Sequence, residues 1–286
     1  MPETAIRYPA LFAAADEASQ SAQTWFSWLA GLQLVAPVAA AILGLAGPGW
    51  PRLAAAAMFS VGLATSIAMQ IRRPERAWFD GRALAESIKT MAWRYVMGVA
   101  PYEGEDLAAA DEHFHTRFKA LIVEYQQLGG ALARGAGPDI TDEMRTLRQR
   151  SLPERKEIYA KQRLGDQVSW YRAQAKSDES RATVWLWLIT LLQLGGLVLA
   201  SVQLARPTTE ANLLPLLAAV IAAAFAWLQL KRHQELAKAY GVAALELGTL
   251  LGRINECDTP ERLAAFVEEA EEAMSREHTL WRARRT

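Results

Sequence analysis

The densest group of side chains that could bind a metal or transfer a proton is Asp111, Glu112, His113 and His115. On a helix, Asp111 and His115 are four residues apart and share one face. Two or three ligands on one face do not complete a metal site, and the sequence offers no other Cys or His cluster to supply the rest. We therefore interpret this group as a solvent-exposed helix face and expect neither a metal nor a cofactor.

Other signatures of catalysis are missing from the sequence. It contains no glycine loop that cradles phosphate and no Gly-x-Ser-x-Gly elbow, and we interpret His233 and His278 as isolated. The single cysteine, Cys257, cannot form an internal disulfide. Equal numbers of basic and acidic residues, 31 of each, give no electrostatic case for nucleic acid. We expect a protein that is not an enzyme and does not bind nucleic acid.

Four glutamines recur at matching positions in two halves of the sequence. Gln33 and Gln193 each lie between two leucines, whereas Gln70 and Gln229 each lie just before a basic step. Two interpretations remain open for these amides: hydrogen bonding between membrane hairpins, or the lining of a pore. Under the second interpretation, all four are predicted pore-lining residues.

The runs that carry these glutamines contain no Asp, Glu, Lys or Arg over residues 18–51, 53–71, 182–205 and 211–230. Crossing about 30 Å of hydrocarbon takes roughly 20 apolar residues. We therefore predict two hairpins of transmembrane helices, with spans at about 24–46, 53–71, 182–204 and 212–230. The tryptophans at the heads of the hairpins are predicted interface anchors: Trp25, Trp28, Trp185 and Trp187.

Basic residues predict the orientation of the spans. Only Arg52 and Arg206 lie in the two short turns. The opposite side carries eight: Arg72, Arg73, Arg76, Arg172, Lys176, Arg181, Lys231 and Arg232. Because cytoplasmic loops are enriched in Lys and Arg, both termini and the long middle segment are expected to be cytoplasmic.

The charged stretches between the spans predict a cytoplasmic helical bundle. The expected helices cover 74–134 in a first domain (1–150), and 153–176 and 231–284 in a second (151–286). Ser151 is a predicted N-cap with Pro153 in the first turn. Residues 3–22 are expected to form a short amphipathic helix. The predicted fold class is an all-α membrane protein with four transmembrane helices in two tandem hairpins.

Within the bundle, Arg82, Glu86 and Lys89 are spaced for pairing along one helix. Trp93 and Trp170 need packed partners. We predict packing or gating roles for nine residues: Arg82, Glu86, Lys89, Trp93, Arg163, Asp166, Gln167, Trp170 and Tyr171.

Three stretches of the sequence resemble the SLATT domains, two-helix membrane effector domains of bacterial conflict systems. The first runs from Trp78 to Lys89, with Trp93-Arg94-Tyr95 and Pro101-Tyr102 after it; the second contains Tyr159, Arg163, Asp166-Gln167 and Trp170-Tyr171; the third contains Glu269, Glu272, Glu277 and Trp281. The pattern is similar to one SLATT type over 1–150 and a second type over 151–286.

The resemblance implies a non-enzymatic, multi-pass effector in the bacterial inner membrane that takes part in antiphage defence. Such an effector would oligomerise and permeabilise the membrane, which arrests growth or kills the cell. Its expected partners are membrane lipid, further copies of the same chain, and a sensor protein or cyclic-nucleotide synthase encoded nearby.

Two other functions compete with this one. A membrane-anchored helical scaffold would recruit cytoplasmic partners without forming a pore, and unrelated apolar hairpins would then support its function equally well. A transporter is disfavoured, because transporters usually carry ionisable residues or broken helices at mid-membrane, and these spans contain no charge.

Overall fold

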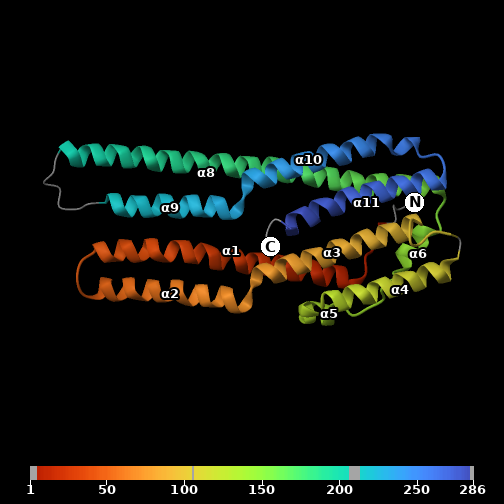
Figure 1. The fold of residues 1–286 in the computed structure, drawn as a ribbon, viewed down its shortest axis with the longest axis horizontal. Helices are drawn as coiled ribbons and strands as arrows, with labels where there is room; N and C mark the ends of the chain where they lie inside the picture. The colour runs from red at the N-terminus through yellow and green to blue at the C-terminus, as the bar shows by residue number, and fades with distance from the viewer. Residues whose placement is uncertain (1–4, 105, 206–212, 284–286) are drawn as a thin grey trace. The chain divides into compact units, whose positions relative to one another are not determined.

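The computed structural model describes residues 5–104, 106–205 and 213–283, with side chains described as far as Ser275. Throughout these ranges all regular structure is helical (Figure 1). The α-helices are α1 (Ala10–Leu45), α2 (Trp50–Arg72), α3 (Pro74–Met97), α4 (Leu107–Glu124), α5 (Gly129–Arg134), α6 (Asp142–Arg148), α7 (Leu152–Tyr159), α8 (Asp166–Ala205), α9 (Leu214–Lys231), α10 (His233–Arg253) and α11 (Pro260–Ala283). A π-helix, Ala160–Gly165, joins α7 to α8.

The chain divides into two compact units. We call residues 24–74 and 174–238 the hairpin unit, and residues 1–23, 75–173 and 239–286 the core unit. The chain passes between them several times, so the units are not consecutive in sequence.

The hairpin unit contains the predicted spans. Four helices are long and apolar enough to cross a membrane, and each overlaps one of the four predicted spans. In the first hairpin, Ala36 and Ala40 of α1 are buried, and a Cβ atom added at Gly62 of α2 would lie 4.0 Å from the Ala36 Cβ. In the second, a Cβ added at Gly196 of α8 would lie 3.3 Å from a methyl of Leu217 in α9. Small residues thus let the paired helices approach closely (Figure 1).

The predicted boundaries of the first helix are wrong. The helix expected over residues 3–22 begins at Ala10, after Pro9, and continues without a break into the first span. No glycine or proline separates these segments, so nothing in the backbone ends the helix there. Within 74–134, where helices are expected, α4 ends at Glu124 and a short 3₁₀ turn follows it. Residues 1–4 lie outside the described part of the chain.

The second helix of each hairpin ends at an arginine with a left-handed backbone. Arg73 has φ 42° and its N–H donates to the Met69 carbonyl at 3.0 Å; Arg232 has φ 52° and donates to the Leu228 carbonyl at 3.1 Å. A residue with a Cβ atom pays about 1–2 kcal/mol for this conformation. The next helix starts at the following residue, so the last predicted helical segment begins at His233 and not at Lys231.

The core unit has a buried interior built from helices far apart in sequence. Leu11 of α1, Ile88 of α3, Phe114 of α4, Leu164 of the π-helix and Val267 of α11 are all nearly inaccessible to solvent. Packing of this density fixes the side chains that project into it. The polar groups buried among these residues are therefore held in defined positions.

Candidate functional site

Three of the four predicted interface tryptophans are exposed. Trp25, Trp28 and Trp187 are 60%, 74% and 64% exposed, and Trp185 is half-buried. In a water-soluble protein this exposure would be costly, whereas indole rings are favourable at the level of lipid headgroups. Their anchoring role stays a prediction.

The four glutamines are all exposed on the hairpin unit. The Gln33 Nε2 of α1 donates to the Ser66 Oγ of α2 at 3.0 Å. This bond joins the two helices of one hairpin and not two different hairpins. Elsewhere in the described structure, the side chains of Gln193, Gln70 and Gln229 make no hydrogen bond. An amide facing hydrocarbon without a partner costs several kcal/mol, so these groups require water or another chain.

Asp178 and His233 form a buried contact that the sequence interpretation missed. His233 was expected to be isolated, but its Nδ1 lies 2.7 Å from the Asp178 Oδ1. Both side chains are almost fully buried within the hairpin unit, and Arg181 approaches the same carboxylate at 4.0 Å. The prediction was wrong because the two residues are far apart in sequence, where no spacing rule applies. His278 lies outside the described side chains.

The central polar feature of the core unit is the ion pair between Arg163 and Glu271. The Arg163 Nε donates to Glu271 Oε1 at 2.8 Å, and its Nη2 donates to Oε2 at 2.7 Å. The two side chains are only 1% and 0% exposed. Burial alone would lower the pKa of Arg163, but the adjacent carboxylate outweighs it and raises that pKa. The arginine therefore stays charged.

Two hydroxyls complete the shell around the Glu271 carboxylate. Tyr159 donates to Oε1 at 3.0 Å, and Thr90 donates to Oε2 at 2.8 Å. The carboxylate thus accepts four hydrogen bonds, which offset the cost of removing it from water. The pKa of Tyr159 is raised well above its ordinary value by burial and by Glu271, so its hydroxyl remains a donor.

Local structure explains how Arg163 reaches this position. The predicted N-cap is confirmed: the Glu154 carboxylate accepts hydrogen bonds from the Ser151 amide at 3.0 Å and hydroxyl at 2.7 Å, which starts α7. The helix then widens into the π-helix that contains Arg163. π-helical turns are rare and often mark functional sites, because the extra residue redirects a side chain.

The sequence interpretation did not select Glu271, although a pattern could have revealed it. The buried residues of α11 include Leu263, Val267, Ala270 and Met274. Glu271 falls four residues after Val267 and three before Met274, on the apolar face of the helix. A carboxylate within an apolar stripe requires a buried cation as a partner.

The other predicted packing and gating residues divide into buried and exposed groups. Trp93 and Tyr171 are fully buried, and the Trp93 Nε1 donates to the Tyr8 hydroxyl at 2.8 Å. The Arg82 guanidinium lies 5.8 Å from the centre of the half-exposed Trp170 ring, within cation–π range. Asp166 is exposed. The packing and gating roles of these residues stay predictions.

The residues first considered as metal ligands point to separate partners. Asp111 accepts hydrogen bonds from Tyr95 at 2.5 Å and from the Arg145 Nη2 at 2.9 Å. His115 contacts Asp139 instead, and its neighbour His113 contacts a backbone carbonyl. No group of three possible ligands occurs among the described side chains.

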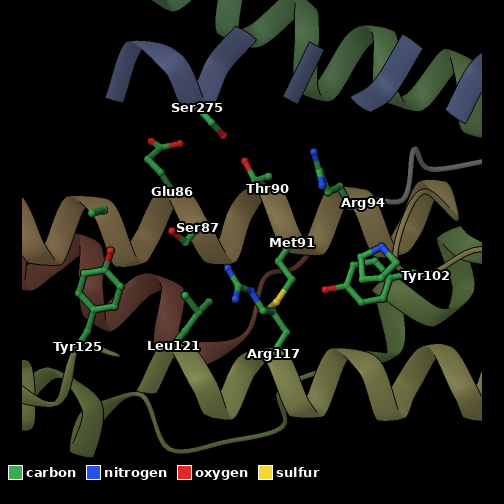
Figure 2. A pocket seen from close by; sticks show the side chains of 12 residues that line it. Glu86, Ser87, Thr90, Met91, Arg94, Tyr102, Arg117, Leu121, Tyr125 and Ser275 are labelled. Atoms are coloured by element: carbon green, nitrogen blue, oxygen red, sulfur yellow. The ribbon is translucent and has the colours of Figure 1, made fainter. Parts of the chain in front are cut away.

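A cavity of about 360 Å³ opens around α3 in the core unit. Figure 2 shows polar side chains on two sides of that helix. Glu86, Thr90 and Arg94 lie on the side of α11, whereas Arg117 and Tyr125 come from α4 and from the residue after it, on the opposite side. Burial raises the pKa of Tyr102 to about 12, although both arginines oppose this. The two guanidinium groups do not converge on one point, so the cavity does not resemble a focused binding site.

Family models match nearly the whole chain in two consecutive segments. Residues 9–156 match the SMODS and SLOG-associating 2TM effector domain 3, and residues 159–281 match domain 1 of the same series. The chain belongs to the SLATT family. It contains two SLATT domains in tandem, as the sequence motifs indicated. No curated protein and no solved structure matches it.

The two SLATT domains meet at the buried ion pair. The first domain contributes Thr90, and Tyr8 lies just before its first matched residue. The second domain contributes Tyr159, Arg163 and Glu271. The Thr90 hydroxyl accepts a hydrogen bond from Arg163 at 3.3 Å while donating to Glu271. With four membrane-length helices and two SLATT domains, the chain is a multi-pass membrane protein. Its two domains share this polar contact inside one core.

Proposed function

We propose that this SLATT protein is a membrane effector of a bacterial conflict system, and that several copies assemble to permeabilise the inner membrane without catalysing a reaction. The observation that supports this most directly is the exposure of the Gln33, Gln193, Gln70 and Gln229 amides on otherwise apolar hairpins. Groups of this kind become stable when they face water or amides of another copy.

One chain alone offers little surface for a water-filled path. Between 6% and 17% of the residues in the apolar stretch of each membrane-length helix are buried within the chain. The exposed remainder is almost entirely apolar and suits lipid or a neighbouring copy. Conduction would therefore require several copies that bring their glutamine-bearing faces together.

The core unit is the natural place for control. By the distribution of basic residues, it would lie in the cytoplasm, where a sensor protein or a nucleotide signal could act on it. Helices α1 and α8 each run continuously from one unit into the other along the chain. A trigger that moves the assembly from nearly all closed to nearly all open must bind the open state more tightly by about 5.5 kcal/mol.

The decisive experiment combines Gln33→Leu with Gln193→Leu. We expect the double variant to insert and express normally but to lose growth arrest in cells and dye release from vesicles. Thr190→Val is the matched control, because the Thr190 hydroxyl is already satisfied by the Leu186 carbonyl at 2.8 Å within its own helix. It should retain full activity.

A double variant that stays as toxic as the parent would contradict an amide-lined pore. If dye release is absent from the parent protein as well, the effector does not permeabilise membranes. Retention of growth arrest after exchange of both hairpins for unrelated apolar ones would then favour the scaffold.

A further inference from the structure

The core unit contains a second cavity, of about 500 Å³, beside the buried ion pair. One wall is the segment of residues 5–12 that precedes and begins α1. The facing walls are α3, the π-helix and the first turn of α8, and they contribute Lys89, Arg163 and Gln167. The Ile6 amide donates to the Gln162 Oε1 at 3.2 Å, which ties the two walls together.

Three donor groups line this cavity without a matching acceptor. The Arg163 Nη1 is buried and has no hydrogen-bond partner, while its other nitrogens bind Glu271 and Thr90. Gln167 is 8% exposed, and its amide makes no hydrogen bond within the described structure. Lys89 likewise has no hydrogen bond or ion pair there, and burial lowers the pKa of its amine.

Nearby carboxylates do not supply the missing acceptor. Glu271 already accepts four hydrogen bonds, and the Asp166 side chain at the cavity edge is exposed to solvent. Glu86 and Asp16 raise the pKa of Lys89 through space, but neither forms an ion pair with it in the described structure. Of the three donors, the Arg163 Nη1 is the fully buried nitrogen without a partner, and a buried charged donor without an acceptor costs stability. A bound ligand that carries acceptor oxygens would remove this cost.

We propose that this cavity binds a small organic oxyanion, with its charged group held by Lys89, Arg163 and Gln167. The side chains of the opposite wall indicate which chemical group the ligand carries beside its oxyanion. The Tyr8 and Phe12 rings lie with centroids 4.6 Å apart, and the Tyr8 hydroxyl is occupied by Trp93. A flat apolar group attached to the oxyanion would pack against these rings. The inference concerns binding and does not depend on pore formation.

Phenyl phosphate is a suitable probe, because it joins a phosphate to a flat apolar ring. We expect it to raise the thermal unfolding midpoint of the full chain in detergent in a saturable manner, and to bind roughly tenfold more tightly than inorganic phosphate by calorimetry. Phenol should have no comparable effect. Equal stabilisation by phenol would show an apolar cavity, and the absence of saturable binding by phenyl phosphate would also overturn the proposal.

Substitution then locates the site. Lys89→Met keeps the length of the side chain and should weaken phenyl phosphate binding roughly tenfold, the loss expected for one charge-assisted hydrogen bond. Gln167→Leu should weaken it less. Lys119→Met, at an exposed position of α4 away from this cavity, is the control and should bind like the parent. Unfolding without the probe verifies that each variant folds; unchanged binding by a folded Lys89→Met protein would refute the assignment.

Discussion

The two SLATT domains bury charge in different ways. Among the described residues, the first domain buries one charged side chain, Arg148, which donates to the backbone carbonyls of Tyr95 and, at 2.6 Å, Tyr102. The second buries two side-chain pairs: Arg163 with Glu271, and Asp178 with His233. A carbonyl partner is part of the backbone and cannot be lost by mutation, whereas each member of a side-chain pair depends on the other.

The same difference occurs where the membrane hairpins end. Arg73 and Arg232 adopt the same left-handed conformation. After Arg73 comes Pro74, which has no N–H and clashes with a helical carbonyl four residues earlier, so local covalent geometry ends α2. After Arg232 comes His233, which is held by Asp178. The end of α2 is thus determined by the adjacent proline, whereas the end of α9 is accompanied by a contact with Asp178 of α8.

The largest effect is expected from Glu271→Ala. It leaves the buried Arg163 charge without a counterion, which costs about 3–5 kcal/mol of stability. Thermal or denaturant unfolding in detergent measures the loss. Glu269→Ala, on the same helix, is the matched control, because Glu269 is 54% exposed and 3.9 Å from an equally exposed Arg253. It should cost about 1 kcal/mol or less. Similar losses of stability for the two variants would mean that the buried Arg163 does not depend on Glu271 as its partner.

Asp178→Ala tests the corresponding pair in the hairpin unit. Removal of the carboxylate leaves the buried His233 ring without its acceptor, so we expect a loss of about 1–3 kcal/mol by the same measurement. The neighbouring Glu179 is exposed, and Glu179→Ala should be nearly neutral. A neutral Asp178→Ala would show that the second hairpin does not rely on this contact.

Pro74→Ala tests the local device in the first domain. The variant restores an N–H and removes the clash with the Gln70 carbonyl, so α2 can run on into α3. Hydrogen exchange over residues 70–78 should slow, with a stability change of about 1 kcal/mol or less. Pro51→Ala is the control, because Pro51 lies in the first turn of α2, where a proline does not end the helix. This variant should leave hydrogen exchange over residues 70–78 unchanged.

The smallest effect is expected from glycine at the two left-handed positions. Arg73→Gly should be more stable than Arg73→Ala by about 1 kcal/mol, because glycine adopts positive φ without a Cβ clash. Arg232→Gly should exceed Arg232→Ala by a similar amount. Comparison with alanine cancels the loss of the charge, including the Arg232–Glu235 ion pair. Unequal differences would indicate that the two breaks are not conformationally equivalent.

Much of the architecture could be predicted from local patterns. The charge-free runs gave the four membrane-length helices, and the SLATT motifs gave the tandem family assignment. Patterns failed where a residue's environment came from distant segments. His233 was interpreted as isolated because Asp178 is distant in sequence. Glu271 was passed over among the acidic residues of α11, because charge alone does not separate it from Glu269; only its position on the apolar face of the helix does.

By itself, the sequence determined which segments have the length and apolarity of membrane spans, where Pro74 ends a helix, and how Ser151 and Glu154 begin one. These features depend on residues within a few positions of each other, where covalent geometry and helix periodicity act directly. Only the tertiary structure decided that Glu271 is buried against Arg163. Burial is produced by helices far apart in the chain, and the cost of an unpaired charge then selects the partner.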